Sequence, residues 1–434
     1  MQITVHRGLN QIGGCITEIA TTCSRIFIDM GDNLPGLEEQ LTEAQKQALV
    51  ESLCNHNKRT HEAVIYTHGH FDHVGMLEYV PASIDQYMSQ GTQDILLLKE
   101  EVLQKGLELG GSNTDKNRFR IQRIRDCKTW QCPPRHHKPQ SWQIGDIKIT
   151  PFFVSHSIFD AHMLLVEAEG KKVLHTGDYR GHGYISKGLF STLQRYVKQV
   201  DVLITEGTML NQEQKVSHEI TISQRMEAMM KGFKYVFVLT SATDIERLAS
   251  INSAARKADR LFVTCSLLMD ETLKYFKSFD NGQTGDLFNF EQVMLSPTKP
   301  DKKLIKSMRN KGFAMVVGAG HGERVKEILQ YFNPEETLLI YSAWDGYYQL
   351  PEQIEINPSY SQMRNLFKNV VDIHTSGHAD RNTIEKVIKT INPREAIIGI
   401  HKEANTSLCS LNLPEELKKK IVPDMLQPNY ISTK

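Results

Sequence analysis

The sequence predicts an α/β fold, and three observations predict it. Short β-prone runs separated by glycines and polar turns occupy the first thirty residues, which is typical of antiparallel strands. From about residue 207 to residue 365, helix-like and strand-like segments alternate, as expected for βα units on a largely parallel sheet. Several strand-like runs end in histidine, aspartate or glutamate, so the candidate functional residues lie at strand ends.

The N-terminal elements are predicted from composition and pattern. The β-prone runs cover residues 2–5, 15–20 and 24–29. Residues 37–53 are rich in Leu, Glu, Gln, Lys and Ala and contain no glycine or proline, which predicts a helix. A second helical pattern covers residues 91–109. Between these helices lies the β-prone segment 63–66, which leads into the densest polar cluster of the chain.

That cluster is the run Thr67-His68-Gly69-His70-Phe71-Asp72-His73. Imidazole and carboxylate groups are preferred ligands of zinc and similar divalent ions. His68 and His70 can point the same way from an extended backbone, whereas Asp72 and His73 follow on the turn and can face a second ion. A polar loop with chance histidines is the alternative, but a buried cluster this dense would then leave polar groups unpaired, which costs free energy.

Further polar residues follow strand-like runs downstream. One run ends at His156, and the paired runs 161–168 and 171–175 lead to Asp178. A strand-like run over residues 202–205 ends at Glu206, and another over residues 396–400 ends at His401. A run near residue 370 leads to His378 and then to a helix from about residue 380 to residue 390. A lone residue of this kind is usually structural, but the recurrence is hard to explain by packing alone.

The block from residue 207 to residue 365 is predicted to contain helices near 219–231, 243–257, 267–278 and 322–331, and strands at 234–239, 260–264, 313–317 and 337–341. The glycine-rich run 317–322 could cradle a phosphate with its amides or be a plain tight turn. The phosphate-binding candidates there are Gly318, Gly320, His321 and Arg324. Trp344, after the last strand, could stack on a base or pack in the core.

Length and charge constrain the class of protein. The chain has 434 residues, enough for two or three domains, and 51 basic residues balance 51 acidic ones. Any contact with a polyanion must therefore come from a local patch. The seven scattered cysteines do not look like a disulfide framework. Because no signal core and no membrane-length apolar run is visible, we expect a cytoplasmic protein without a membrane span.

One local basic stretch lies between residues 110 and 140. Its basic residues are Lys116, Arg118, Arg120, Arg123, Arg125, Lys128, Arg135 and Lys138, against Asp115 and Asp126. The stretch could contact nucleic acid or form a solvated flank. A small zinc site is a further hypothesis for this stretch, although its spacing fits no standard module; its ligands would be Cys127, Cys132, His136 and His137.

The H-x-H-x-D-H run and the ordered strand-end residues resemble the metallo-β-lactamase superfamily. The run Ser376-Gly377-His378-Ala379 is similar to the RNase J-like form of its β-CASP branch. The resemblance covers essentially the whole chain. It implies a metallo-β-lactamase αββα sandwich with an inserted α/β β-CASP cap domain. Residues 1–206 would form the first part of the sandwich, residues 207–365 the cap domain and residues 366–434 the completing segment.

The resemblance also implies a site that holds two divalent metal ions, zinc or else manganese. One ion would be held by His68, His70 and His156, and the other by Asp72, His73 and His401, with Asp178 bridging the two ions. Asp29, at the end of the third strand, would hold the metal-binding loop by hydrogen bonds, unless it is only a turn-forming aspartate. Ser376 and Gly377 would join the phosphate-binding candidates.

The implied function is a metal-dependent nuclease that hydrolyses phosphodiester bonds in single-stranded RNA, with DNA as a further substrate, using water activated by two metals. Asp178 would orient the water, and His378, held by Glu206, would protonate the departing oxygen. Two alternatives are a hydrolase of small esters, thioesters or lactones, and a non-catalytic nucleic-acid-binding scaffold. Lys402 replaces a glycine common in RNase J-like chains and could reshape the pocket.

Overall fold

The computed structural model describes residues 1–130, 140–212, 216–279, 286–296, 301–423 and 429–432 of the chain. Contacts divide the chain into two compact units. The first comprises Met1–Gly181, Ile185–Lys215 and Gly377–Lys434, and the second comprises His182–Tyr184 and Val216–Ser376. The domain limits expected from the sequence, at residues 206 and 365, stay predictions.

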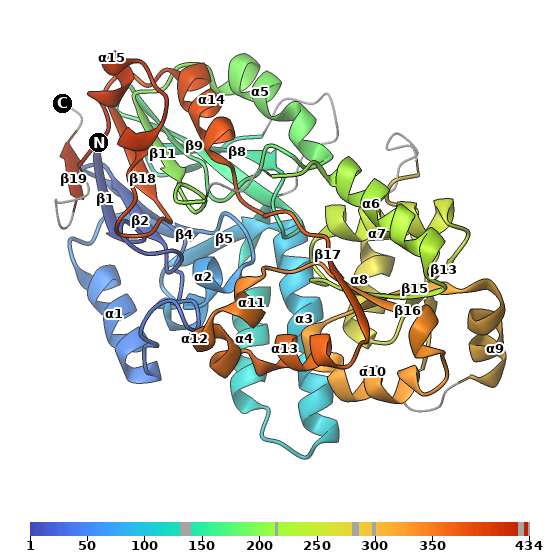
Figure 1. Ribbon diagram of the computed structural model, residues 1–434. Helices are drawn as coiled ribbons and strands as arrows, with labels where there is room; N and C mark the ends of the chain where they lie inside the picture. Colours follow the sequence, from blue (N-terminus) through green and yellow to red (C-terminus); the bar gives the residue numbers. More distant parts are fainter. Residues whose placement is uncertain (131–139, 213–215, 280–285, 297–300, 424–428, 433–434) are drawn as a thin grey trace. The chain divides into compact units, whose positions relative to one another are not determined.

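The first unit contains two β-sheets (Figure 1). One sheet has the order β19-β1-β2-β3-β4-β5-β6 and the other has the order β18-β11-β10-β9-β8-β7. The strands of the first sheet are β1 (Gln2–Arg7), β2 (Ile16–Ala20), β3 (Ser24–Ile28), β4 (His61–Ile65), β5 (Asp85–Ser89), β6 (Lys128–Trp130) and β19 (Asn429–Ser432). Those of the second are β7 (Trp142–Ile144), β8 (Ile147–Val154), β9 (Ala161–Ala168), β10 (Lys171–His175), β11 (Val202–Glu206) and β18 (Ala396–Ile400). Because β19 pairs antiparallel with β1, the two ends of the described chain lie in one sheet.

These two sheets pack face to face. Ile26 and Ile65 of the first sheet share one buried cluster with Val166 and Ile204 of the second. Because side chains alternate along a strand, the opposite faces are left for helices. The helices of this unit are α1 (Glu43–Asn55), α2 (Phe71–Val74), α3 (Gln90–Leu109), α4 (Asp115–Arg125), α5 (Leu189–Thr192), α14 (Arg381–Ile391) and α15 (Glu415–Lys418). Helices α1, α3 and α4 cover the outer face of the first sheet, and α14 covers that of the second. The predicted αββα sandwich is confirmed.

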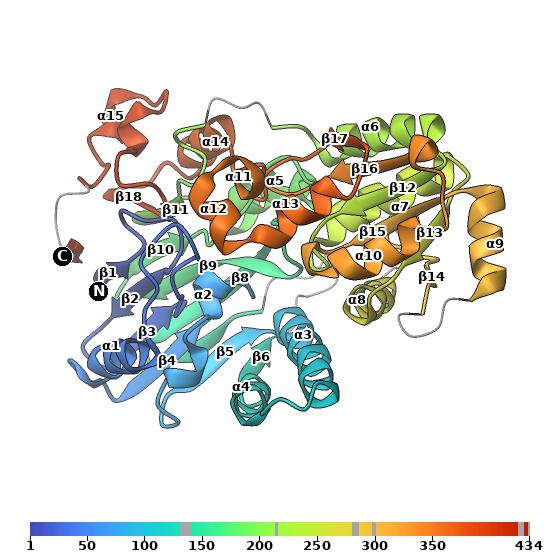
Figure 2. The ribbon, with the colours of Figure 1, turned by 60° about the horizontal axis from the view of Figure 1, so that its bottom comes forward.

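Two helices of this unit test the sequence predictions directly. The predicted helix over residues 91–109 is confirmed as α3, which lies beside α4 (Figure 2). In contrast, α1 begins at Glu43 and not at residue 37 as expected. The hydroxyl of Thr42 accepts the N–H of Gln45 at 3.3 Å, and the Thr42 N–H donates to Gln45 Oε1 at 2.8 Å. This capping box satisfies the first amides and sets the start of the helix.

The second unit is an α/β unit around a parallel sheet with the order β14-β13-β15-β12-β16-β17. Its strands are β12 (Tyr235–Leu239), β13 (Leu261–Thr264), β14 (Val293–Met294), β15 (Phe313–Val317), β16 (Thr337–Tyr341) and β17 (Asn369–Asp372). Its helices are α6 (Glu219–Gly232), α7 (Ile245–Lys257), α8 (Leu267–Lys277), α9 (Lys302–Lys311), α10 (Gly322–Leu329), α11 (Gly346–Gln349), α12 (Pro351–Ile356) and α13 (Pro358–Asn365). Helices α6 and α7 lie on one side of the sheet, and α10 and α13 lie on the other (Figure 1).

The predicted parallel sheet of the inserted block is confirmed, with β15 and β16 at the predicted residues. Helices α9, α11, α12 and α13 and the short strand β14 were not predicted. The strand near residue 370 is β17, which pairs with β16, so it adds to the sheet of the second unit. The sequence places these residues in the predicted completing segment, residues 366–434.

Within the described part of the chain, no helix has both the length and the apolar character that a membrane crossing requires. The described cysteines are free thiols: Cys15, Cys23, Cys54, Cys127, Cys265 and Cys409.

Candidate metal centre

The run Thr67–His73 leaves β4 and turns into the four-residue helix α2, which begins directly after His70. Two glycines pack tightly against this turn. A Cβ atom on Gly31 would lie 1.7 Å from the carbonyl oxygen of Asp72, and one on Gly13, where φ is +83°, would lie 2.8 Å from the Cβ of Asp72. Because only glycine allows such close approach, these two positions determine where Asp72 lies.

Three imidazoles form the first ligand group. His70 Nδ1 lies 3.2 Å from His68 Nε2 and 3.0 Å from His156 Nε2. Two nitrogens bound at about 2.0–2.1 Å to one tetrahedral zinc would lie about 3.3 Å apart. The spacing of the three rings therefore fits one shared ion. His156 follows β8, and its Nδ1 donates to the carbonyl oxygen of Gly377 at 2.6 Å.

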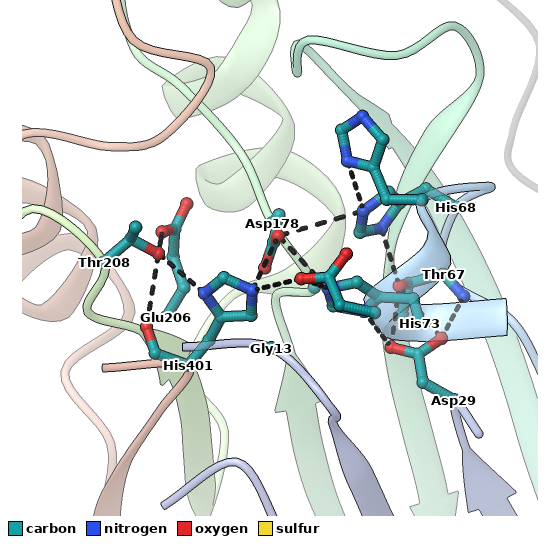
Figure 3. A network of polar contacts seen from close by, with 12 residues as sticks. Gly13, Asp29, Thr67, His68, His73, Asp178, Glu206, Thr208 and His401 are labelled. Atoms are coloured by element: carbon teal, nitrogen blue, oxygen red, sulfur yellow. Dashed lines mark hydrogen bonds and ion pairs between the residues drawn. The ribbon is translucent and has the colours of Figure 1, made fainter. Parts of the chain in front are cut away.

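A second ligand group comprises Asp72, His73, Asp178 and His401. Asp178 follows β10, and its Oδ2 lies 3.2 Å from His73 Nε2 and 3.5 Å from His401 Nε2. The same oxygen lies 3.8 Å from Nε2 of His68 and 3.8 Å from Nε2 of His156. Figure 3 shows Asp178 facing His68, His73 and His401. One carboxylate oxygen thus faces both groups, as a ligand bridging two ions must.

The burial of these groups tests whether they fit divalent cations. His68, His73 and Asp178 are each at most 2% exposed. His73 Nε2 and Asp178 Oδ2 are buried and lie 3.2 Å apart, but neither atom makes a hydrogen bond of normal geometry to a described residue. Leaving such atoms unsatisfied is costly, whereas a bound cation would satisfy both. Imidazole nitrogen and carboxylate oxygen are donors that zinc accepts. The residues present therefore fit two divalent ions.

The pKa shifts of the first ligand group and of Asp178 favour their metal-binding forms, whereas His73 differs. Burial lowers the pKa of His73, but Asp178, Asp29 and Asp72 outweigh burial and raise it well above the ordinary value. Burial lowers the pKa of His68 and of His156 well below the ordinary value, and it lowers that of His70 to about 4. Burial alone would raise the pKa of Asp178, but His401 and His73 outweigh this effect and hold the pKa well below the usual range. Neutral imidazoles and ionised carboxylates are the forms that bind metal.

Asp29 holds the metal-ligand loop by hydrogen bonds. Its Oδ1 accepts the N–H of Thr67 at 2.7 Å, and its Oδ2 accepts the Thr67 hydroxyl at 2.8 Å and His73 Nδ1 at 2.8 Å. Asp29 has φ +64°, a left-handed conformation that is unusual for a residue other than glycine. With Nδ1 held by Asp29, the Nε2 of His73 faces Asp178.

Glu206 and His378 form a second titratable pair beside the ligand groups. His378 Nδ1 lies 2.9 Å from Glu206 Oε2, while Glu206 Oε1 accepts the N–H groups of Tyr179 at 3.0 Å and Ala379 at 3.2 Å. Burial lowers the pKa of His378, but the Glu206 carboxylate, together with more modest effects of other nearby acids, outweighs burial and raises the pKa to about 9. The ring therefore carries a proton at neutral pH.

Two residues near the centre were missed by the sequence analysis. Thr208 Oγ1 lies 2.7 Å from His401 Nδ1 and donates to Glu206 Oε2 at 2.8 Å. Cys15 is buried, and its sulfur is grouped with the ring nitrogens of His73 and His401. Only weak sequence features could have pointed to these residues. Thr208 lies just past the end of β11, and Cys15 follows two glycines.

The predicted phosphate-binding residues fall mainly in the second unit. Gly318 follows β15, and its N–H donates to His321 Nδ1 at 3.1 Å, within a short turn that also includes Gly320. Arg324, in α10, donates to the carbonyl oxygen of Ser296 and pairs with Glu327 at 3.0 Å. Ser376 ends the second unit, whereas Gly377 belongs to the first. Their role in phosphate binding stays a prediction.

Two other sequence hypotheses concern single side chains. Lys402 is fully buried, and its Nζ donates to the carbonyl oxygen of Thr406 at 2.9 Å, so its side chain lies along the loop after His401. Trp344 is partly buried and packs edge-on against Tyr347, with 5.3 Å between ring centroids. This contact is consistent with the packing role considered for Trp344.

The basic stretch between residues 110 and 130 is largely neutralised by ion pairs. The pairs are Lys116–Glu43 (2.7 Å), Arg118–Glu108 (3.1 Å), Arg120–Glu100 (3.2 Å), Arg120–Glu78, Arg125–Glu101 (2.7 Å) and Lys128–Asp85 (2.5 Å). Pairing reduces the positive charge available to a polyanion, which favours the solvated-flank alternative. The residues Cys132, Arg135, His136, His137 and Lys138 lie outside the described residues, so of the ligands of the hypothetical small zinc site only Cys127 is described.

Residues 31–236, which include every proposed ligand except His401, match the family model of the Beta-lactamase superfamily domain. This part of the chain is thus similar to a β-lactamase superfamily domain.

Curated proteins similar to this chain carry RNase J names. It is 24% identical to the RNase J-like protein of Methanocaldococcus jannaschii over 93% of each chain. It is 22% identical to Ribonuclease J of Pyrococcus abyssi, over 94% of this chain and 91% of that protein. The match to Ribonuclease J of Helicobacter pylori, 24% identical, spans 63% of this chain and only 37% of the relative. The predicted resemblance to RNase J-like proteins is confirmed.

A solved structure shares the whole fold. A protein of unknown function from Enterococcus faecalis superposes with a TM-score of 0.72 over 99% of both chains, at 17% sequence identity. The fold with two packed β-sheets and a second α/β unit is therefore already seen in a solved structure.

Proposed function

We propose that the chain is a metal-dependent ribonuclease that hydrolyses phosphodiester bonds in single-stranded RNA. The observation that carries the proposal is the position of Asp178, whose Oδ2 lies 3.2–3.8 Å from imidazole nitrogens of both ligand groups. Support for RNA as the substrate class comes from the names of the relatives, which include Ribonuclease J and the Endoribonuclease ysh-1 of Neurospora crassa.

In this proposal His68, His70 and His156 hold one divalent ion, and Asp72, His73 and His401 hold the other, with Asp178 between them. When bound, the two ions would neutralise charge on the phosphodiester and activate a water for attack on phosphorus. Zinc suits the imidazole-rich donor set, and manganese suits the carboxylates.

His378 acts as the general acid in the proposed reaction. Glu206 is fully buried and holds His378 through Nδ1 at 2.9 Å, while the side chain of His378 is 20% exposed. Its pKa of about 9 keeps the ring protonated at neutral pH. Held in this way, the ring would give the proton on Nε2 to the departing oxygen of the substrate.

A cleavage assay tests the proposal. The purified protein is incubated with zinc or manganese and with end-labelled single-stranded RNA, the matching DNA, and a panel of esters, thioesters and lactones. We expect RNA cleavage, and the product sizes distinguish internal cutting from cutting at an end. Turnover of the small esters without RNA cleavage would reject the nuclease, and binding of RNA without cleavage would favour the scaffold.

The Asp72→Ala variant is expected to lose cleavage, because it removes a proposed ligand, and to keep its fold as judged by circular dichroism. Asp115→Ala, at an exposed position at the start of α4, is the matched control and should cleave normally. Full activity of Asp72→Ala would contradict the two-metal assignment.

A further inference from the structure

Two imidazoles of the centre are held at the nitrogen that faces away from the ligand groups. His73 Nδ1 donates to the Asp29 carboxylate at 2.8 Å, and His156 Nδ1 donates to the carbonyl oxygen of Gly377 at 2.6 Å. Carboxylate and carbonyl oxygens can only accept, so the proton lies on Nδ1 in both rings. In the neutral form of each ring, Nε2 then presents its lone pair toward the centre, as metal binding requires.

His68 and His401 face a different kind of partner. His68 Nδ1 lies 3.0 Å from the hydroxyl of Thr67, and His401 Nδ1 lies 2.7 Å from the hydroxyl of Thr208. A threonine hydroxyl can both donate and accept a hydrogen bond. Alone, it would therefore leave the protonation of the ring undetermined.

In both places a carboxylate removes this ambiguity. The Thr67 hydroxyl donates to Asp29 Oδ2 at 2.8 Å, and the Thr208 hydroxyl donates to Glu206 Oε2 at 2.8 Å. A hydroxyl has one proton, so an oxygen that donates to a carboxylate can only accept from the imidazole. The carbonyl oxygen of His401, 3.2 Å from Thr208 Oγ1, is a competing acceptor, but it leads to the same result for the ring.

The other partners of Glu206 support a hydrogen bond that runs from the Thr208 hydroxyl to the carboxylate. Its other partners are the N–H groups of Tyr179 and Ala379 and the Nδ1 of His378, which donate to it. Glu206 thus acts as an acceptor in this network, and Thr208 supplies a further donor. Figure 3 shows the Thr208 hydroxyl close to both Glu206 and His401.

We propose that Thr208 is a positioning residue that, through its hydrogen bond to Glu206, keeps a proton on Nδ1 of His401 and so presents Nε2 to the second ion. The pair Thr67 and Asp29 does the same for His68. This inference rests on the proposed metal centre. In this inference Glu206 has two roles. Its carboxylate holds His378, the proposed general acid, and through Thr208 it orients His401, a proposed metal ligand.

The test uses Thr208→Val, which keeps the shape of the side chain without its hydroxyl, and Thr208→Ser, which keeps the hydroxyl. Zinc affinity is measured by competition with a chromophoric chelator, so the result does not depend on RNA cleavage. We expect Thr208→Val to bind the second ion about 10- to 100-fold more weakly, the usual effect of losing a partner of a metal ligand. Thr208→Ser should recover most of the affinity. Thr60→Val, at an exposed position before β4, should bind like the wild type.

Wild-type affinity in Thr208→Val, or an equal loss in Thr208→Ser, would overturn the inference. A second measurement, by NMR spectroscopy, does not depend on the Thr208→Val variant. In the metal-free full-length protein labelled with ¹⁵N-histidine, long-range ¹H–¹⁵N spectra, with His401 assigned from the His401→Gln protein, report which ring nitrogen carries a proton. A proton on Nδ1 of His401 supports the inference, and a ring protonated only on Nε2 overturns it. Failure to cleave RNA, in contrast, would count against the proposed function, but it would not change the measured zinc affinity or the position of the ring proton.

Discussion

Glu206 illustrates how a single buried side chain organises the candidate centre. One of its oxygens accepts two backbone N–H groups, and the other accepts Thr208 and His378. The backbone bonds hold the carboxylate in one place, so the ring that it binds also has a defined position. A proton donor held in this way is preorganised for catalysis.

Replacement of His378 tests this arrangement. His378→Ala is expected to slow RNA cleavage by about 10²-fold or more, because a general acid typically contributes that much. The metal content should not change, because His378 is not among the proposed ligands. Single-turnover cleavage and metal analysis measure the two effects. His56→Ala, at an exposed site after α1, is the control. A normal cleavage rate would exclude the role of His378.

The sequence predicted the candidate ligands better than their supporting contacts. The proposed ligands could be found because they stand next to strand-like runs and because His68, His70, Asp72 and His73 are close together in the chain. Thr208 and Cys15 carry no such pattern, since their partners are distant in sequence. The sequence left two interpretations of the basic stretch open for the same reason: Glu43, Glu78 and Asp85, which pair with its basic residues, lie on other elements.

At the level of elements, close backbone contacts place α2 beside the end of β3. The N–H of Cys15 donates to the carbonyl oxygen of Asp72 at 3.1 Å, and the N–H of Gly31 donates to that of Cys15 at 3.1 Å. The N–H of Met30 donates to the carbonyl oxygen of His73 at 2.8 Å. Helix α2 has only four residues, too few for a helical periodicity, so the sequence predicted a loop there.

Gly31→Ala tests the importance of this contact. The added Cβ would lie 1.7 Å from a backbone oxygen of Asp72, so the loop has to move. We expect weaker binding of the second ion and lower stability, measured by metal titration and chemical denaturation. Gly106→Ala is the matched control, because nothing lies within 4 Å of its added Cβ in α3. It should stabilise the protein by about 0.5–1 kcal/mol. Wild-type metal binding by Gly31→Ala would contradict the expectation.

At the level of the whole molecule, the sequence predicted elements correctly where the local residue pattern is typical of a strand in a parallel sheet. Buried five-residue runs predicted β15 and β16 at their observed residues. The segment from α11 to α13 was missed because it packs through aromatic contacts, such as the stacked rings of Tyr347 and Tyr360 with centroids 4.2 Å apart. Such contacts leave no regular apolar spacing in the sequence.

Metal removal should change the stability of the first unit. Ligands that bind only the native state stabilise it, by about 2.7 kcal/mol per site at a free concentration one hundred times the dissociation constant. The buried His73 Nε2 and Asp178 Oδ2 gain partners when the ions bind. We therefore expect chelation to lower the midpoint of the thermal transition of the first unit, and zinc to restore it, in calorimetry. An unchanged midpoint would argue against ions bound in this cluster.

The number of divalent ions bound per chain tests the central claim most directly. After incubation with zinc and removal of free metal, elemental analysis should find about two ions per wild-type chain. Asp178→Asn should bind clearly fewer, because the shared carboxylate loses its charge while its size is kept. A wild-type chain without zinc, or an Asp178→Asn chain that holds as much zinc as the wild type, would contradict the proposed two-ion centre.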